Sequence, residues 1–414
     1  MSFYLYILSS STRIEYLVSC ILERMPTLTK NKLLLATYIM TILYALHYGM
    51  PLYATSSFLN MHFSSPYVST LFMLGSVLTL FASLRFTKYL RRFHTYRFVL
   101  TVVISDILAT LALILTTNPY LLGIAFLLHF CFQSLILICL NVFIETFTNH
   151  AQAGAVRGIF LTLLNFGILI APFFGGAILS MTHSFTILYT VAAFTLVPFI
   201  FFLRRFMYHA PDPVYHSIDI LRALSHAWGN KNLRGAFVAV FLLECFYAFM
   251  VIYFPIYIVN IGVPLLTYLT AIVPISLIPL VVLPYELGII ADKKLGEKEL
   301  LIFGLLVTAA SVLTMAVLTT TVTIIWIIVL VISRVGAASI ETMVYTYFYK
   351  KIGPDDVSLT AAFTNMRSTA TIVMTAVSIL LAPLLITHPQ LIFILLALAL
   401  LYGVTYILPI RDTR

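Results

Sequence analysis

Charged side chains are scarce in this chain of 414 residues. Asp, Glu, Lys and Arg make up 9% of it, against about 25% in a typical soluble domain, while 61% of the residues are hydrophobic. Three stretches, 33–84, 158–203 and 368–410, contain no charged residue at all. So little charge cannot cover a surface that faces water. The composition therefore excludes a soluble globular protein and indicates that a lipid bilayer surrounds the chain.

The uncharged stretches are long enough for pairs of membrane-spanning helices. One span needs about 20 apolar residues, and each stretch holds at least twice that number. Three further hairpins, near 98–145, 235–285 and 300–349, carry isolated charges. Six hairpins predict an all-α membrane protein with twelve transmembrane helices. The predicted spans start near residues 33, 66, 97, 119, 158, 184, 235, 264, 300, 322, 357 and 389.

Lys and Arg are absent from the six predicted hairpin tips, such as "TTNPY" and "NIGVP". All basic residues outside the spans lie in the termini or in the loops that join one hairpin to the next. Because Lys and Arg accumulate on the cytoplasmic side of a membrane, this pattern places both termini in the cytoplasm. We expect a multi-pass protein of the plasma (cell inner) membrane. The same placement accounts for the net charge of +9 without a nucleic acid partner.

A polar segment at 204–234, the longest inside the chain, separates two sets of six spans. Both sets begin on the same side, so we expect parallel repeats related by a pseudo-two-fold axis along the membrane normal. The predicted parts are a cytoplasmic N-terminal segment at 1–32, six-helix halves at 33–203 and 235–410 on either side of the cytoplasmic linker at 204–234, and a cytoplasmic tail at 411–414.

Two segments outside the spans have an apolar helical face. Residues 12–25 begin with a capping-box pattern and predict a helix on the inner membrane surface or on the bundle. The linker holds the second amphipathic segment. Its apolar face consists of Ile220, Leu221, Leu224, Ala227 and Trp228.

Seven charges fall between Glu286 and Glu299, in the loop that follows the second span of the C-terminal half. This loop reads "GIIADKKLGEK", and with twelve spans in two halves the chain resembles the major facilitator superfamily. The resemblance implies that Gly288, Asp292, Lys293 and Gly296 belong to a clamp that closes the cytoplasmic gate. An ordinary solvated loop is the alternative. The matching loop of the N-terminal half is worn, because Ser83, Thr87 and Leu90 stand at its glycine, aspartate and glycine positions.

The fifth span is similar to the antiporter motif of this superfamily, G-x8-G-x3-G-P-x2-G-G. The matching residues are Gly158, Gly167, Pro172, Gly175 and Gly176, and Ala171 replaces one glycine. Small residues let helices approach closely, so we expect this span to pack tightly on a partner and to shape the gate. Within the superfamily the pattern resembles that of the drug:proton antiporter group.

Charges deep in a membrane are costly and usually mark a pathway or a paired site. Five lie inside predicted spans: Asp106, Glu244, Arg334, Glu341 and Arg367. In the superfamily the first and fourth spans of each half line the central cavity. The resemblance therefore places these residues towards it: Tyr44, His47, His129, Glu244, Arg334 and Glu341.

We expect Glu341 and Arg367 to form a structural ion pair between spans 10 and 11, because a buried charge needs a partner. Glu244 is then the first candidate for a proton-coupling carboxylate, and Arg334 would act on it. A static salt bridge between these two residues is the alternative. Asp106 and His129 are further candidates for proton coupling, since histidine titrates near neutral pH.

The sequence predicts a secondary transporter that works by alternating access. Its expected activity is proton-coupled efflux of a small amphipathic compound, as in multidrug antiporters, by a monomer in the bilayer. The alternatives are transport of an anionic solute by way of Arg334, and a non-transporting sensor that kept the fold. No catalytic motif such as HExxH, GxSxG or a phosphate-binding loop is present, so we expect no enzyme activity, cofactor or metal.

Overall fold

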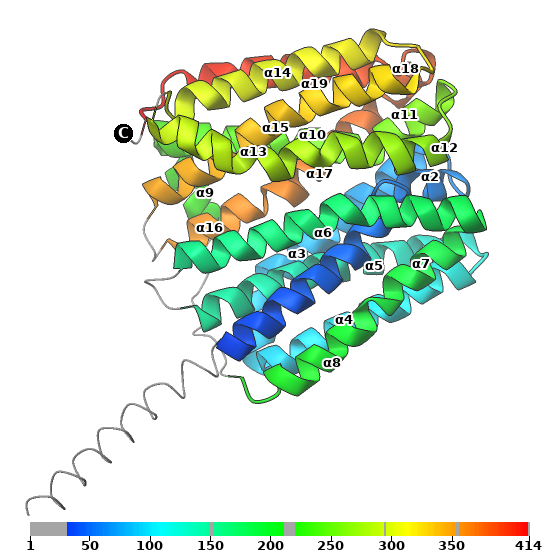
Figure 1. Cartoon of the computed structure of the whole chain (residues 1–414), viewed down its shortest axis with the longest axis vertical. Coiled ribbons are helices and arrows are strands. Elements are labelled where there is room, and N and C mark those ends of the chain that lie inside the picture. The colour runs from blue at the N-terminus through cyan, green and yellow to red at the C-terminus, as the bar shows by residue number, and fades with distance from the viewer. Residues whose placement is uncertain (1–30, 149–152, 211–219, 294, 353–355, 413–414) are drawn as a thin grey trace, which may run out of the picture.

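The structure is a computed structural model of the chain. It describes residues 31–148, 153–210, 220–293, 295–352 and 356–412, and all regular structure in these ranges is helical. The helices form one elongated bundle whose long members run side by side (Figure 1). Ten of them are long and apolar enough to cross a membrane.

The first six spans lie between residues 31 and 207. They are Asn31–Leu52 (span 1), α3 Ser65–Phe93, α4 Thr95–Leu115, α5 Pro119–Phe147, α6 Ala153–Thr182, and α7 Phe185–Phe194 with α8 Leu196–Met207; the short helix α2, Thr55–Asn60, follows span 1.

The other six spans follow α9, Ile220–Gly229. Spans 7 and 11 are each built from consecutive helices, because turns interrupt them beside Pro255, Asn365 and Pro383. Span 8 contains a π-helical turn, η2. In order they are α10 Lys231–Ile252 with α11 Phe254–Asn260; α12 Leu265–Thr267, η2 Tyr268–Ile272 and α13 Val273–Lys293; α14 Glu297–Val317; α15 Thr323–Lys351; α16 Val357–Thr364, α17 Met366–Leu380 and α18 Ala382–Thr387; and α19 Leu391–Ile407.

The predicted all-α fold with twelve spans is confirmed. Each predicted start lies within a few residues of a helix start. The largest differences are at α6 and α10, which begin earlier than predicted. The prediction started these two spans directly after Arg157 and Arg234, whereas both helices begin before the apolar segment and include Arg157, Lys231 and Arg234.

The bundle has two ends, which we name by their loops. The basic end carries the loops that join the hairpins, together with α9, α16 and the C-terminus. The tip end carries the six hairpin tips, and Figure 1 shows the two ends at opposite sides of the bundle. The halves meet mainly along two pairs of spans, α3 with α17, and α6 with α13 and η2 of span 8. The short helix α2 also contacts α10 and α11.

At the tip end the halves are in close contact. A Cβ atom added to Gly176 of α6 would lie 3.1 Å from the carbonyl carbon and oxygen of Leu269 in η2. Between α3 and α17 the hydroxyl oxygens of Ser69 and Ser378 are 3.5 Å apart. The backbones of α6 and η2 are in direct contact, so no solute can pass between these two helices at the tip end.

Nearer the basic end the contacts between halves are polar. Ser83 of α3 donates to Asn365 Oδ1 at 2.7 Å. The Arg157 guanidinium of α6 donates to the Tyr349 hydroxyl of α15 at 2.8 Å and lies 4.8 Å from the centre of that ring. Side chains rather than backbone make these contacts, so they can separate without repacking a helix.

The span 5 glycines pack as expected at three of four positions. Gly167 faces Ala45 of span 1, Gly175 faces the Met50 carbonyl, and Gly176 faces η2 across the two halves. Gly158 has open space around it. Pro172 lies buried within α6. Span 5 therefore packs closely on span 1 and on the other half.

The charged loop between α13 and α14 fastens the basic end of the C-terminal half. Glu297 is buried and pairs with Lys350 of α15 at 2.7 Å. Gly296 precedes α14 with φ of +115°, and Asp412 accepts a hydrogen bond from the Lys298 backbone amide at 2.9 Å. The Asp292 side chain lies outside what the structure describes, and Lys293 is exposed. The clamp at Asp292 stays a prediction.

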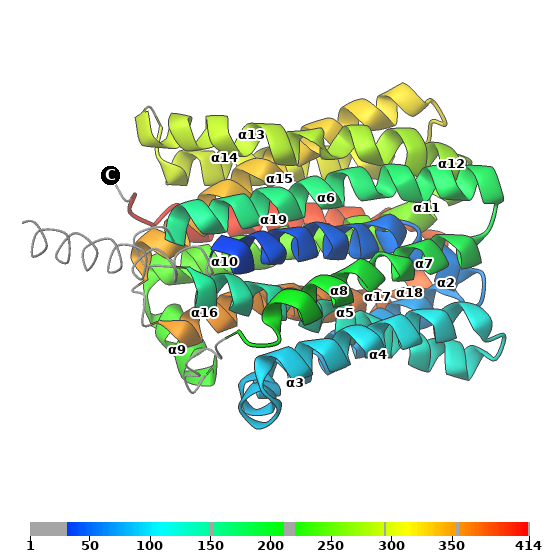
Figure 2. The same ribbon diagram turned by 60° about the horizontal axis from the view of Figure 1, so that its bottom comes forward.

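The linker helix α9 packs against α10 and α16, and Figure 2 shows it beside α16 at the basic end. Ala223 and Ala227 are buried, and Ile220 and Leu224 pack on the core. Trp228 lies in the last turn, four residues after Leu224 and therefore on the same face, and it is 57% exposed. The predicted helix at 12–25 lies outside the described residues.

The close contact at Gly175 gives a testable prediction about stability. Gly175→Ala places a methyl group against the Met50 carbonyl, where only backbone could move, so we expect a loss of about 1–3 kcal/mol. Thermal unfolding of the purified protein measures this loss. The matched control is Gly158→Ala, which enters open space and should be neutral or stabilise by up to about 1 kcal/mol. Equal effects of the two variants would contradict the packing described here.

Candidate functional site

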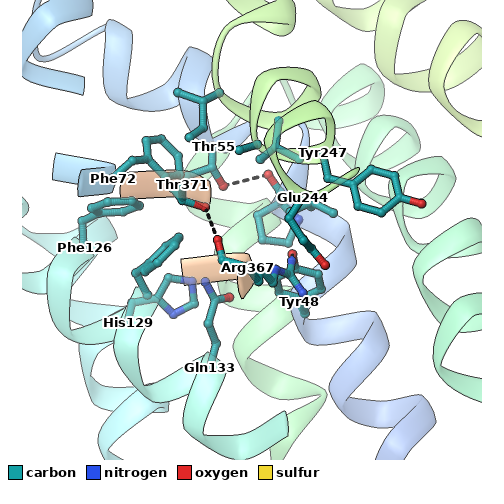
Figure 3. Close-up of a pocket in the computed structure, with 16 residues that line it drawn as sticks. Tyr48, Thr55, Phe72, Phe126, His129, Gln133, Glu244, Tyr247, Arg367 and Thr371 are labelled. Atoms are coloured by element: carbon teal, nitrogen blue, oxygen red, sulfur yellow. Dashed lines mark hydrogen bonds between the residues drawn. The ribbon is translucent and has the colours of Figure 1, made fainter. Parts of the chain in front are cut away.

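A cavity of about 70 Å³ lies between the two halves, and both contribute side chains to it. Phe72, Phe126 and Phe130 form an apolar wall from α3 and α5, with ring centres 5.0–5.8 Å apart. The polar groups come from span 1, α2, α5, α10 and α17 (Figure 3). They are Tyr48, Thr55, His129, Gln133, Glu244, Tyr247, Arg367 and Thr371.

Glu244 and Arg367 form the charged part of the cavity, and the two charges act on one another. Arg367 lies deep between the helices, yet its side chain is exposed because it faces the cavity. Its guanidinium donates a hydrogen bond to the Tyr48 hydroxyl and lies 5.4 Å from the centre of the Tyr48 ring. Tyr48 stacks in turn on Tyr44, with ring centres 5.9 Å apart. A charged side chain of the C-terminal half therefore binds a side chain of the N-terminal half across the cavity.

The predicted ion pair of Glu341 and Arg367 is wrong. Glu341 instead accepts a hydrogen bond of 2.6 Å from the Tyr247 hydroxyl of α10. Arg367 lines the cavity, where the Tyr48 hydroxyl is its hydrogen-bond partner. A tyrosine hydroxyl thus satisfies each of the two charges that were expected to satisfy one another.

Arg334 does not line the cavity. Its side chain is 1% exposed, and its guanidinium carbon lies 5.1 Å from the centre of the Phe246 ring and 5.8 Å from that of Tyr247. Nε and Nη1 have no hydrogen-bond partner among the described residues. Among the described residues Arg334 forms no salt bridge with Glu244, so the alternative of a static pair is wrong; the guanidinium packs against the two aromatic rings instead.

A buried polar cluster lies in the N-terminal half, directly behind the cavity wall. Asp106 of α4 is fully buried, and its two carboxylate oxygens contact His47 Nε2 at 2.9 Å and His129 Nδ1 at 2.8 Å. One ring nitrogen of each histidine and one carboxylate oxygen of Asp106, the atoms that could bind a metal ion, lie within 4.8 Å of one another. No other group of His, Cys, Asp and Glu among the described residues is arranged in this way. Direct hydrogen bonds already engage these atoms, so the contacts are satisfied without an ion.

The predicted cavity residues divide into two sets. His129 and Glu244 line the cavity. Tyr44, His47, Arg334 and Glu341 lie behind it, each in contact with a neighbouring side chain. The sequence analysis missed Gln133 and Thr371, although each lies four residues after a singled-out residue, His129 or Arg367, and therefore on the same helical face.

Comparison with known proteins agrees with this architecture. The Major Facilitator Superfamily profile matches residues 37–373. No curated protein sequence matches the chain.

Solved structures share the fold at low sequence identity. The crystal structure of the nucleoside transporter NupG is 13% identical with a TM-score of 0.72, and the match covers 92% of this chain and 100% of that one. A bacterial homolog of the human lysosomal transporter Spinster, in an inward-facing and unoccupied conformation, is 11% identical with a TM-score of 0.66, over 92% of this chain and 95% of that one. Since the family profile covers more than half of the sequence, the chain belongs to the major facilitator superfamily and is a multi-pass membrane transporter of small molecules rather than an enzyme.

Proposed function

We propose that the chain is a proton-coupled antiporter that exports a small amphipathic solute, with Glu244 as the carboxylate that exchanges a proton for the solute. One observation carries this proposal. Glu244 is the only carboxylate among the residues that line the cavity, and it shares that cavity with Arg367. A proton on Glu244 would leave the positive charge of Arg367 unbalanced, so proton binding and the contacts of Arg367 are linked.

The lining supports a solute with an aromatic or apolar body and one polar or cationic end. Phe72, Phe126 and Phe130 offer ring faces, and Gln133 and Thr371 offer hydrogen bonds. A cation would be attracted by the aromatic faces and by ionised Glu244. The cavity of about 70 Å³ is smaller than the roughly 300–1,000 Å³ of a typical ligand site. Solute entry would therefore need the halves to separate, as in alternating access.

The order of events follows from the charges. Ionised Glu244 attracts the solute, and Arg367 holds Tyr48 of the other half. When a proton reaches Glu244, the carboxylate loses its attraction for a cation, and the solute leaves. Opposite movement of proton and solute is antiport, and export is the direction that the span 5 glycine pattern supports. We place the basic end in the cytoplasm and the protein in the plasma membrane as a monomer.

Transport of an anionic solute is a second candidate function. Arg334 favours it, because two of its buried nitrogens have no hydrogen-bond partner among the described residues. Such a solute would have to pass Phe246 and Tyr247, which lie against the guanidinium. A solute anion at Arg334 would supply the missing hydrogen bonds, so Arg334→Met would abolish transport of anions and leave transport of cations intact.

The coupling role of Glu244 is tested in liposomes that contain the purified protein and a pH gradient. With ethidium as a fluorescent aromatic cation, we expect Glu244→Gln to slow gradient-driven movement by roughly tenfold or more, the change that about 1.4 kcal/mol produces. The amide keeps the shape of the side chain and cannot ionise. Glu286→Gln, at an exposed carboxylate of the basic end, is the matched control. Equal rates in wild type and both variants would refute coupling at Glu244, and a protein without transport would give no gradient-driven signal in any form.

Removal of the Tyr48 hydroxyl tests the hydrogen bond between Arg367 and Tyr48. Tyr48→Phe keeps the ring beneath the guanidinium and removes the hydrogen bond that crosses the halves. A hydrogen bond to a charged group contributes about 1.5–3 kcal/mol, so we expect a change of several-fold or more in the rate of ethidium movement. Tyr44→Phe, on the ring stacked behind Tyr48, is the control and should have little effect. If the two variants behaved alike, the cross-cavity hydrogen bond would not contribute to transport.

A further inference from the structure

The cluster of His47, Asp106 and His129 joins three spans inside the N-terminal half. His47 belongs to span 1, Asp106 to α4 and His129 to α5, and all three side chains are buried. One side of the cluster reaches the cavity, because His129 is part of its lining (Figure 3). Asp106 is the only carboxylate deep in the spans of this half, and no Lys or Arg accompanies it there. Its hydrogen-bond partners therefore determine the charge of the cluster.

The partners of His47 fix where its protons lie. Nδ1 is 2.9 Å from the Ala192 carbonyl oxygen, which can only accept, so Nδ1 carries a hydrogen. Nε2 is 2.9 Å from Asp106 Oδ2. A neutral histidine with its hydrogen on Nδ1 presents a lone pair at Nε2, which would face the lone pairs of a carboxylate. The contact therefore requires one more proton, either on Nε2 or on Asp106 Oδ2.

The partners of His129 complete the count. The Thr110 hydroxyl donates to the Asp106 backbone carbonyl at 2.8 Å, so its oxygen is free to accept. His129 Nδ1 lies 3.0 Å from that oxygen and 2.8 Å from Asp106 Oδ1. Nδ1 is therefore the donor to both, and His129 is satisfied as a neutral ring. With the extra proton between His47 and Asp106, the cluster carries no net charge.

We infer that this cluster is a second proton-binding site, which holds one exchangeable proton between His47 and Asp106 and exchanges it with the cavity through His129. His129 Nε2 makes no hydrogen bond to any described residue. A proton taken up there and the Nδ1 proton passed to Asp106 Oδ1 leave His129 neutral, with its hydrogen on Nε2. Rotation of the protonated carboxyl group about its Cβ–Cγ bond then turns the delivered proton towards His47 Nε2, so one proton enters and one reaches the contact between His47 and Asp106. In its use of this proton the inference rests on the transport function proposed above, whereas the proton count rests on the cluster alone.

No other charged side chain among the described residues is paired with the cluster, so its net charge depends on its own protons. The titratable side chains that face it from neighbouring elements are Tyr44 of span 1, Cys131 of α5 and Tyr189 of α7. None of them is charged at neutral pH. Among the described residues, no Lys, Arg or Glu forms an ion pair or hydrogen bond with the cluster, and the charges nearest to its open side are Glu244 and Arg367, which line the cavity with His129.

Loss of the proton would move span 1. Two lone pairs would then face one another at 2.9 Å, and a buried carboxylate would be left without charge compensation, which is strongly unfavourable. His47 is adjacent to Tyr48, the residue that Arg367 holds from the other half. A shift of His47 away from Asp106 would therefore also move Tyr48 and change its hydrogen bond with Arg367 between the halves.

Infrared spectroscopy of the full-length protein tests the proton directly, with Asp106→Asn as the variant. Its amide fits the cluster, since the nitrogen can donate to His47 Nε2 and the oxygen can accept from His129 Nδ1. At neutral pH the difference between wild type and variant should contain a protonated carboxyl or an imidazolium. An ionised carboxylate with no imidazolium beside it would overturn the inference. So would one equivalent of bound transition metal in the wild type by elemental analysis, because the metal would replace the proton. His226→Gln, at an exposed histidine of α9, should lack the difference.

Transport distinguishes this inference from the proposed function. With ethidium in liposomes, Asp106→Asn mimics the proton-loaded cluster, so it should lose at least tenfold of gradient-driven movement while exchange of ethidium across equal pH persists. Full gradient-driven movement in Asp106→Asn would contradict a transported proton at the cluster. Absence of gradient-driven movement in the wild type would refute the proposed function and would leave the infrared result to decide the proton count.

Discussion

Neutrality of charge inside the membrane is the constraint on which the rest of this structure depends. An ionised group in an apolar bundle costs several kcal/mol unless a partner compensates it. The C-terminal half meets this constraint with equal numbers, since Glu244 and Glu341 are matched by Arg334 and Arg367. The N-terminal half has Asp106 and two histidines, so a proton must do what arginine does in the other half. The two halves share a fold and solve the same electrostatic problem with different chemistry.

Tyrosine hydroxyls, rather than opposite charges, bind two of these charged groups. Direct ion pairs would lock the spans, but here Tyr247 binds Glu341, and Tyr48 binds Arg367 across the cavity. Each of these hydrogen bonds has one neutral partner, so breaking it does not require two opposite charges to be pulled apart. The tip end has backbone contacts at Gly176, and the basic end has side-chain contacts such as that of Arg157 with Tyr349. The contacts between the halves are therefore built differently at the two ends.

The sequence predicted the number, order and approximate limits of the spans, because charges and apolar length determine them directly. It also indicated the residues whose burial needed a reason, such as Glu244 and Asp106. It failed on their partners. In a membrane bundle both the lipid face and the core face of a helix are apolar, so periodicity does not give the rotation of each span. The link from Arg367 to Tyr48 joins residues 319 positions apart, and the meeting of His47, Asp106 and His129 depends on the rotation of three helices.

The most direct test measures how far apart the halves are at each end while the pH changes. Spin labels at Met61 and Asn260 report on the tip end, and labels at Arg92 and Lys293 on the basic end; all four residues are exposed. In the full-length protein in lipid vesicles, we expect a change from neutral to acidic pH to move the two distances in opposite directions. Distances that stay fixed, or that rise and fall together, would contradict alternating access controlled by a proton.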